Sequence, residues 1–328
     1  MSQNNQAPPA RGEQKNIDYL GLFKRAARIV WQNRFLFWFG LLMALGSPGG
    51  MNFSPSGNDL GSNQEAAKNF FASHWVLAAT LATLAFAVVI IFFLLSLLGK
   101  AGLIGAVNKI VLGKKMNFRS GWKIGKRYFL KLLRLFLLFF LAILIIILVL
   151  AIPVVYLLTI HSWIAALLVG LLAVAILIPI ALILFFTNTY ATFYIVLSDL
   201  KVMSAVETAY GLLTRRLGPS LIFGLLLLAL NIIFALAVLP IAALVLLILI
   251  PAGTLFFFLS KIAFGIYLAL AILLFIAAAL FVGSIFTTYK TTVWVLFFRE
   301  IAEVKKEEFE KVAEEETEKQ IAAAPEKA

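Results

Sequence analysis

The sequence predicts an all-α polytopic membrane protein with about six transmembrane helices, and three observations carry this prediction. Hydrophobic residues make up 62% of the 328 residues and charged residues 13%, against roughly 45–50% and about 25% in soluble domains. Mean hydropathy is +1.00. Several apolar runs reach the length of about 20 residues that a helix needs to cross roughly 30 Å of hydrocarbon. A soluble fold has too little interior to bury so much apolar surface.

The N-terminal segment, residues 1–17, is polar and rich in Gln, Asn and Pro, which predicts a disordered cytoplasmic segment. It lacks the basic region, apolar core and cleavage site of a secretory signal. We therefore expect a retained transmembrane helix to direct insertion. Cysteine is absent, so disulfides, thiolate metal sites and cysteine nucleophiles are excluded.

The apolar runs give six candidate spans: about 29–47, 75–98, 133–158, 164–187, 220–250 and 263–287. The first contains Arg34, whose side chain would have to reach back to the headgroups. The fifth is overlong, and Pro240 predicts a kink in it. An alternative with seven spans divides the fifth run at Pro240 and uses 241–260 as a further crossing.

The distribution of positive charge favours six transmembrane spans over seven. With six spans, all of the 28 Lys and Arg residues except Lys68 and Lys261 fall on one side of the membrane. The positive-inside rule places that side, with both termini, in the cytoplasm. A seventh crossing would move the cations of the C-terminal tail outside. We therefore predict a multi-pass protein of the cytoplasmic membrane with a membrane domain at 18–298.

The tail, residues 299–328, mixes acidic residues and lysines at helical spacing, as in Glu303–Lys306 and Glu307–Lys311. It is predicted to be a charged cytoplasmic helix. A solvated extension is the preferred interpretation; docking on the basic stretch at 116–134, or on a partner protein, is the alternative.

The stretch MNFRSGWKIGKRYFLKLLRLF, residues 116–136, combines an apolar stripe with cations on the opposite side of a helix. This pattern is typical of a helix that lies in the membrane interface, where anionic headgroups attract each cation by about 1 kcal/mol. A nucleic-acid partner would need a recognisable binding module, and none is found. The residues predicted to contact lipid headgroups are Arg119, Lys123, Lys126, Arg127, Lys131 and Arg134.

Similar apolar stripes precede the first and fifth spans: Leu20, Phe23, Ala27 and Val30 in one, and Val202, Val206, Ala209 and Leu213 in the other. This predicts three repeats, each made of an interfacial helix followed by a helical hairpin. The alternative is that any cytoplasmic helix before a span has this pattern.

The segment IVLSDLKVMSAVETAYGLLTRRLGPSLIFGLLLLAL, residues 195–230, has Asp199 at the exit of a span, then an amphipathic helix, a basic pair and a long apolar helix. It resembles the membrane domain associated with some bacterial glycerophosphodiester phosphodiesterases, and related uncharacterised six-span proteins. The first unit, DYLGLFKRAARIVWQNRFLFWFGLLMAL, has a matching beginning. The resemblance implies the architecture and a membrane role. It does not imply the hydrolase activity, because the soluble domain that carries it in those enzymes has no counterpart here.

Catalytic motifs such as GxxxxGK[ST], HExxH and GxSxG are absent. His74 and His161 are predicted in different outer loops without acidic neighbours, so no metal or cofactor is expected. Asn231 is the most notable polar residue within a span; a hydrogen bond to another helix is preferred over a role in a substrate path. The pairs Ala166–Gly170 and Ala279–Gly283 predict close helix packing, within the bundle or between protomers.

These observations favour a non-enzymatic membrane scaffold or accessory component. Its expected partners are membrane lipids with anionic headgroups and, through the bundle or the tail, another protein or a second copy. The alternative is a carrier or permease for a small or lipid-like substrate, with a cavity near Asn231 and the proline-bearing spans. A lipid-modifying enzyme is disfavoured because ionisable residues do not cluster within the spans.

Overall fold

The computed structural model describes residues 17–46 and 74–302, without the side chain of Leu259. The predictions for the N-terminal segment, for Lys68 and for the tail beyond residue 302 lie outside these residues. The described part is all-helical, which confirms the all-α part of the predicted fold class. Its helices are α1 Tyr19–Gln32, α2 Leu36–Leu45, α4 Trp75–Val111, α5 Phe118–Thr159, α6 Trp163–Leu197, α7 Val202–Arg215, α8 Leu217–Leu259 and α9 Lys261–Ile301.

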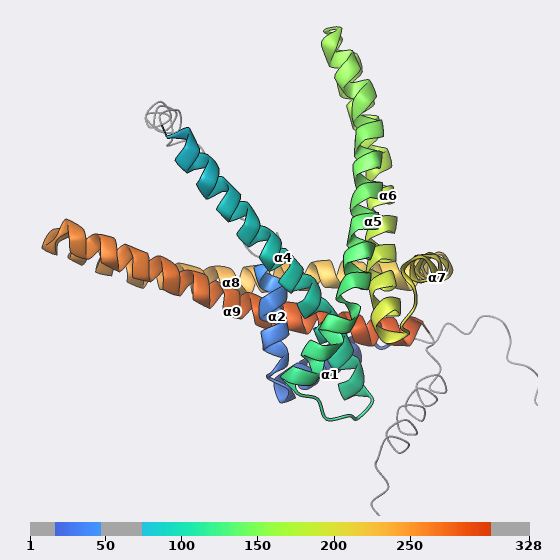
Figure 1. The fold of residues 1–328 in the computed structure, drawn as a ribbon, viewed down its shortest axis with the longest axis horizontal. Coiled ribbons are helices and arrows are strands. Elements are labelled where there is room, and N and C mark those ends of the chain that lie inside the picture. Colours follow the sequence, from blue (N-terminus) through green and yellow to red (C-terminus); the bar gives the residue numbers. More distant parts are fainter. Residues whose placement is uncertain (1–16, 47–73, 303–328) are drawn as a thin grey trace, which may run out of the picture.

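Three apolar arms diverge from a common base (Figure 1). One arm is the outer part of α4, the second is the α5–α6 hairpin and the third is the α8–α9 hairpin. The base consists of α1, α2 and α7, together with the adjoining ends of the five long helices. Nearly all of the buried side chains belong to the base, whereas the arms expose leucine, isoleucine and phenylalanine along their length. Such exposure is the expected state of helices whose solvent is lipid.

Within the described residues, five helices are long and apolar enough to cross a membrane: α4, α5, α6, α8 and α9. In α5 no charged residue follows Arg134 up to Thr159, which at 1.5 Å per residue is about 37 Å. This length exceeds the roughly 30 Å of the hydrocarbon core. By length and composition, the chain is a multi-span membrane protein.

The prediction of a first span at 29–47 is wrong in the described residues. The chain forms two short helices there, because α1 ends at Gln32 and α2 has ten residues, or about 15 Å. Asn33 ends α1: its backbone N–H and its side-chain amide both donate to the Ile29 carbonyl oxygen, at 3.1 and 2.8 Å. Asparagine favours such local bonds over continuing a helix.

The helix predicted at 116–134 and the third span are one continuous helix, α5. No proline or asparagine interrupts the chain between Phe118 and Ile152. By contrast, α7 and α8 are separated at Arg216, just before Gly218 and Pro219, and proline is favoured in the first turn of a helix. The first and third of the proposed repeats therefore contain a separate amphipathic helix, and the second does not.

Helix α8 runs as one helix from Leu217 to Leu259, past Pro240 and Pro251. The alternative with seven spans requires the chain to reverse near Pro240, so this continuity contradicts it. The reversal instead lies at Ser260, between α8 and α9, where the Ser260 hydroxyl oxygen accepts from the Ile262 N–H at 3.2 Å.

An aromatic core joins α6, α8 and α9 within the base. The rings of Phe223 and Phe297 are stacked with their centroids 3.7 Å apart, and Trp294 meets Phe223 edge-on at 4.8 Å. The buried Tyr190 hydroxyl donates to Ser220 Oγ at 2.7 Å. This bond satisfies a polar group that would otherwise be costly to bury.

Glycines bring α4 and α5 into close contact. A Cβ atom at Gly102 would lie 2.7 Å from the Phe39 ring and 2.9 Å from the Gly121 carbonyl oxygen. At Gly125 it would lie 2.7 Å from the Leu98 carbonyl oxygen. Small residues at such positions allow helix backbones to approach in a membrane. The glycines of the predicted pairs, Gly170 and Gly283, have no atom within 4 Å of an added Cβ, so the described part of the chain shows no close helix packing at them. Packing between protomers at these positions stays a prediction.

Candidate lipid-binding sites

The basic side of the first half of α5 is open to the surroundings. Of the six predicted headgroup contacts, Lys131 is half-buried and the other five are exposed. The opposite side of this helix packs on the protein itself, through the buried residues Gly121, Gly125, Tyr128 and Leu132. The apolar stripe expected to enter the lipid is therefore largely occupied by protein contacts. Contact of the six cations with lipid stays a prediction.

Two of these cations are bound by Asp199. Arg127 Nη2 lies 2.7 Å from Asp199 Oδ2, and Lys131 Nζ lies 2.5 Å from Asp199 Oδ1 and 3.1 Å from its carbonyl oxygen. Asp199 follows the end of α6 with φ at +51°, so this contact joins α5 to the α6–α7 connection. The resemblance singled out Asp199, but its partners lie about 70 positions earlier, and no local pattern indicates them.

The electrostatics of Asp199 follow from this geometry. Partial burial acts to raise the pKa of its carboxyl, but the hydrogen bonds and charges of Lys131 and Arg127 outweigh it and lower the pKa below 3.8. The pKa of the Asp199 carboxyl is lower in the folded state than in the unfolded state. The folded protein is therefore stabilised by this contact at pH values above the ordinary pKa of an aspartate. This stabilisation is lost as the pH falls through the folded-state pKa.

We expect Asp199→Asn to lower the free energy of unfolding in detergent by about 1 kcal/mol at pH 7, the scale of a partly exposed ion-pair network. The difference from the unsubstituted protein should shrink as the pH is lowered below 4. Urea unfolding at pH 7 and pH 3 measures both effects. Glu207→Gln, at an exposed carboxylate of α7, is the matched control, and an equal loss in the control at pH 7 would contradict the role of Asp199.

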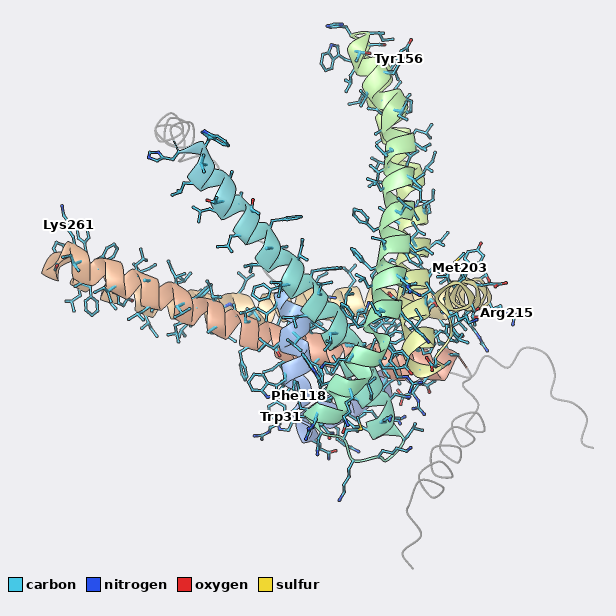
Figure 2. All side chains as sticks on the ribbon, in the orientation of Figure 1. Trp31, Phe118, Tyr156, Met203, Arg215 and Lys261 are labelled. Carbon is cyan, nitrogen blue, oxygen red and sulfur yellow. The ribbon has the colours of Figure 1, made fainter. Side chains whose placement is uncertain are left out.

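The base carries far more positive than negative charge. Its carboxylates within the described part of the chain are Asp18, Asp199, Glu207 and Glu300. Every described Lys and Arg except Lys261 belongs to the base or to the adjoining helix ends. Figure 2 shows Lys261 and Tyr156 at the tips of two arms, with Arg215 and Phe118 at the base. The molecule thus has one cationic end and three apolar arms.

No metal site is found in residues 17–46 and 74–302: they contain no group of three or more His, Asp or Glu side chains able to hold an ion. His74 precedes α4 and His161 lies in the α5–α6 turn, at the tips of two different arms. The two histidines therefore do not come together.

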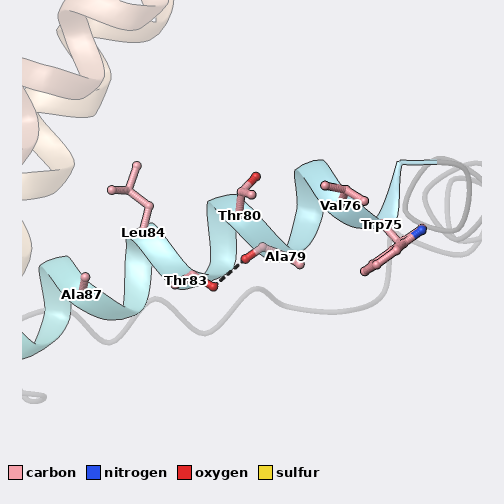
Figure 3. A pocket seen from close by; sticks show the side chains of 7 residues that line it. All are labelled: Trp75, Val76, Ala79, Thr80, Thr83, Leu84 and Ala87. Atoms are coloured by element: carbon pink, nitrogen blue, oxygen red, sulfur yellow. Dashed lines mark hydrogen bonds between the residues drawn. The ribbon is translucent and has the colours of Figure 1, made fainter.

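A shallow hollow runs along the outer part of α4 between Trp75 and Ala87 (Figure 3). Thr80 and Thr83 line it, but their hydroxyls donate to the carbonyl oxygens of Leu77 and Ala79 in the same helix, both at 2.8 Å. Almost all of its lining is apolar, and none of the described residues that line it is charged. This surface has the character of a lipid-facing helix side and offers little to orient a specific ligand.

A larger groove of about 710 Å³ lies between α8 and α9, and the end of α2 borders it at Ala44. Asn231 lines this groove. Its side-chain amide donates to the Leu227 carbonyl oxygen of its own helix at 2.6 Å, so the hydrogen bond expected between helices is replaced by one within α8. Thr287 and Lys290 from α9 also line the groove, and the rest of its wall is apolar apart from backbone.

The fold and these surfaces define a class: a multi-span α-helical membrane protein with a cationic base and apolar arms. The chain belongs to the Family of unknown function (DUF7544), which its residues 26–304 match. The match is to this family and not to the membrane domain of glycerophosphodiester phosphodiesterases, so that resemblance is not supported. No curated protein matches the chain, and no solved structure matches it.

Proposed function

We propose that the protein is a non-enzymatic scaffold of the cytoplasmic membrane. Its base gathers anionic lipid headgroups on the cytoplasmic side, and its arms offer apolar surfaces to lipid and to the helices of other membrane proteins. The observation that carries this proposal is the separation of charge. The cations of the base greatly outnumber the four described carboxylates, and all but one of the described cations lie at that end.

The charge balance argues for lipid as the counterion. Asp199 neutralises part of the charge on Arg127 and Lys131. Arg119, Lys123 and Arg134, on the exposed side of α5, form no ion pair with a carboxylate in the described ranges. At the base of arms that carry no charge over a membrane-spanning length, such cations lie at headgroup depth, where anionic lipids attract them. The positive-inside rule gives this end a cytoplasmic orientation.

We expect the full-length protein in nanodiscs of mixed phosphatidylglycerol and phosphatidylcholine to retain phosphatidylglycerol preferentially. Replacing Arg119, Lys123, Lys126 and Arg134 together with glutamine should lower this enrichment at least fivefold, since each cation contributes about 1 kcal/mol. Lipid extraction and quantification measure the enrichment. Lys261→Gln, at the tip of the α8–α9 arm, is the control and should leave it unchanged. Equal enrichment in the fourfold variant would overturn the lipid part of the proposal.

The groove beside Asn231 favours a second candidate, a carrier for a small or lipid-like substrate. Transport assays in vesicles containing the full chain separate the two. Saturable movement of a solute or a fluorescent lipid that Asn231→Leu reduces would favour the carrier. No saturable movement, with a constant partner protein recovered in fixed stoichiometry from native membranes, would favour the scaffold.

A further inference from the structure

We propose that the groove between α8 and α9 is a binding site for one anionic phospholipid, with the phosphate at Lys290 and an acyl chain in the apolar part of the groove. The proposal rests on the shape, polarity and length of this groove. It does not depend on the scaffold role, because a carrier could hold such a lipid as well.

The groove exists because the hairpin is closed at two levels and lined by small side chains between them. Near the base, the rings of Phe234 and Phe286 are stacked at 3.8 Å. Nearer the tip, the Tyr267 hydroxyl donates to the Leu249 carbonyl oxygen at 2.7 Å. Among the wall residues between these levels are Ala242, Ala278, Ala279 and Gly283, and a Cβ at Gly283 would meet no atom within 4 Å. Small residues therefore leave a channel that the hairpin does not fill.

The polar groups of the groove lie at its base end. Asn231 of α8 is three residues before Phe234, and Thr287 and Lys290 of α9 follow Phe286. The stacking of the two phenylalanine rings places these three polar residues at one level. The groove is therefore amphiphilic: one end presents a cation, an amide and a hydroxyl, and the remainder is apolar.

The positive charge of Lys290, at the base end of the groove, favours an anionic ligand. Lys290 Nζ lies over the Phe286 ring, 5.5 Å from its centroid, and no described carboxylate lies within ion-pair distance of it. None of the described residues that line the groove is acidic. A half-buried cation without a protein counterion gains most from a ligand that carries negative charge.

The length of the groove is suited to an acyl chain. The groove extends along α9 from Lys290 to Leu274, which is 16 residues or about 24 Å. One leaflet contains about 15 Å of hydrocarbon, so the groove is long enough for an acyl chain that spans the leaflet. Lys290 also ends the uncharged part of α9 that begins after Lys261, which puts its ammonium group at headgroup depth. A ligand with its charge at the surface and a chain directed into the hydrocarbon matches these features.

The test uses the full-length protein in nanodiscs with two photoactivatable diazirine lipid probes of identical chains, one with a phosphatidylglycerol and one with a phosphatidylcholine headgroup. We expect the phosphatidylglycerol probe to label peptides of the groove, within 231–249 and 274–290, more strongly than the phosphatidylcholine probe. Lys290→Gln should lower groove labelling by the phosphatidylglycerol probe about fivefold, the effect of one headgroup-level cation. Gly283→Leu, which fills the channel, should lower groove labelling by both probes.

Lys261→Gln, on the same helix but at the tip, is the matched control and should leave the labelling unchanged. Circular dichroism and size-exclusion chromatography establish that each variant is folded. Equal labelling by the two probes, labelling of the groove no stronger than that of the outer part of α4, or crosslinking of the groove to a second copy of the chain would each overturn the proposal. Lys290→Gln should abolish the preferential labelling of the groove and leave the phosphatidylglycerol enrichment caused by the α5 cations unchanged. This result would show that the groove and the cationic surface of the base are two distinct lipid sites.

Discussion

Replacing Phe223 with alanine is expected to lower the free energy of unfolding by about 3–5 kcal/mol, the range for a large aromatic side chain removed from a packed core. The ring is fully buried, with 0% of its surface exposed. It stacks on Phe297 at 3.7 Å and receives the edge of Trp294 at 4.8 Å. These contacts join α8 to α9 within the base, so the cavity left by the substitution would lie where the two helices meet.

Equilibrium unfolding of the purified protein in detergent, followed by circular dichroism, measures this loss. Phe258→Ala is the matched control, because the Phe258 ring on the outer part of the same helix is 86% exposed. Removing a ring that faces lipid or detergent leaves no cavity, so we expect a change within about 0.5 kcal/mol. Similar losses at the two positions would show that the aromatic core of the base does not determine stability.

Replacing Gly40 with leucine is expected to cost about 3 kcal/mol, the upper part of the range for overpacking. A Cβ at this position would collide with the Thr288 hydroxyl and the Ser284 carbonyl oxygen of α9. A backbone carbonyl within a helix cannot rotate away as a long side chain can. The hydroxyl of Ser284 also donates to the Phe37 carbonyl oxygen at 2.6 Å, and the substitution would break this bond by moving α2 away from α9.

Gly170→Leu provides the comparison, since a Cβ there meets no atom within 4 Å. Leucine is a better helix former than glycine by up to about 1 kcal/mol, so this control should be neutral or slightly stabilising. Thermal unfolding of the two variants under identical detergent conditions gives the difference. If the two leucine variants were equally stable, α2 would not be docked on α9 as described.

The apolar stripes of the amphipathic helices were predicted to enter the lipid, and the structure uses them, in part, for packing within the protein. In α7 the buried residues Ala205, Ala209 and Leu213 lie on the predicted stripe or beside it. In α1 the predicted stripe included Leu20, which is 72% exposed, while Leu22 and Ala26 are buried. Because α1 has apolar residues at neighbouring positions around the helix, spacing alone leaves its rotation open, and the contacts with α9 fix it.

The sequence alone is sufficient to predict that the long helices face lipid and where most of them lie. Apolar runs without charge, such as 164–187 and 263–287, are long enough to cross the hydrocarbon. In lipid, such a segment satisfies its backbone hydrogen bonds by forming a helix. The sequence also determined which ends of those helices carry the cations, because charged side chains are excluded from hydrocarbon. These properties depend on local composition, so they can be predicted from the sequence without knowledge of the fold.

Which small and polar residues meet depends on how the helices are placed against one another. Gly102 packs closely and Gly170 does not, although both are glycines in apolar helices. Asp199 finds Arg127 and Lys131, and Lys290 comes level with Asn231 across the α8–α9 hairpin. In lipid, where burial of apolar surface does not favour one helix side over another, association depends on shape and on a few polar contacts. Those contacts join residues far apart in the chain, and they exist only once the helices have been placed side by side.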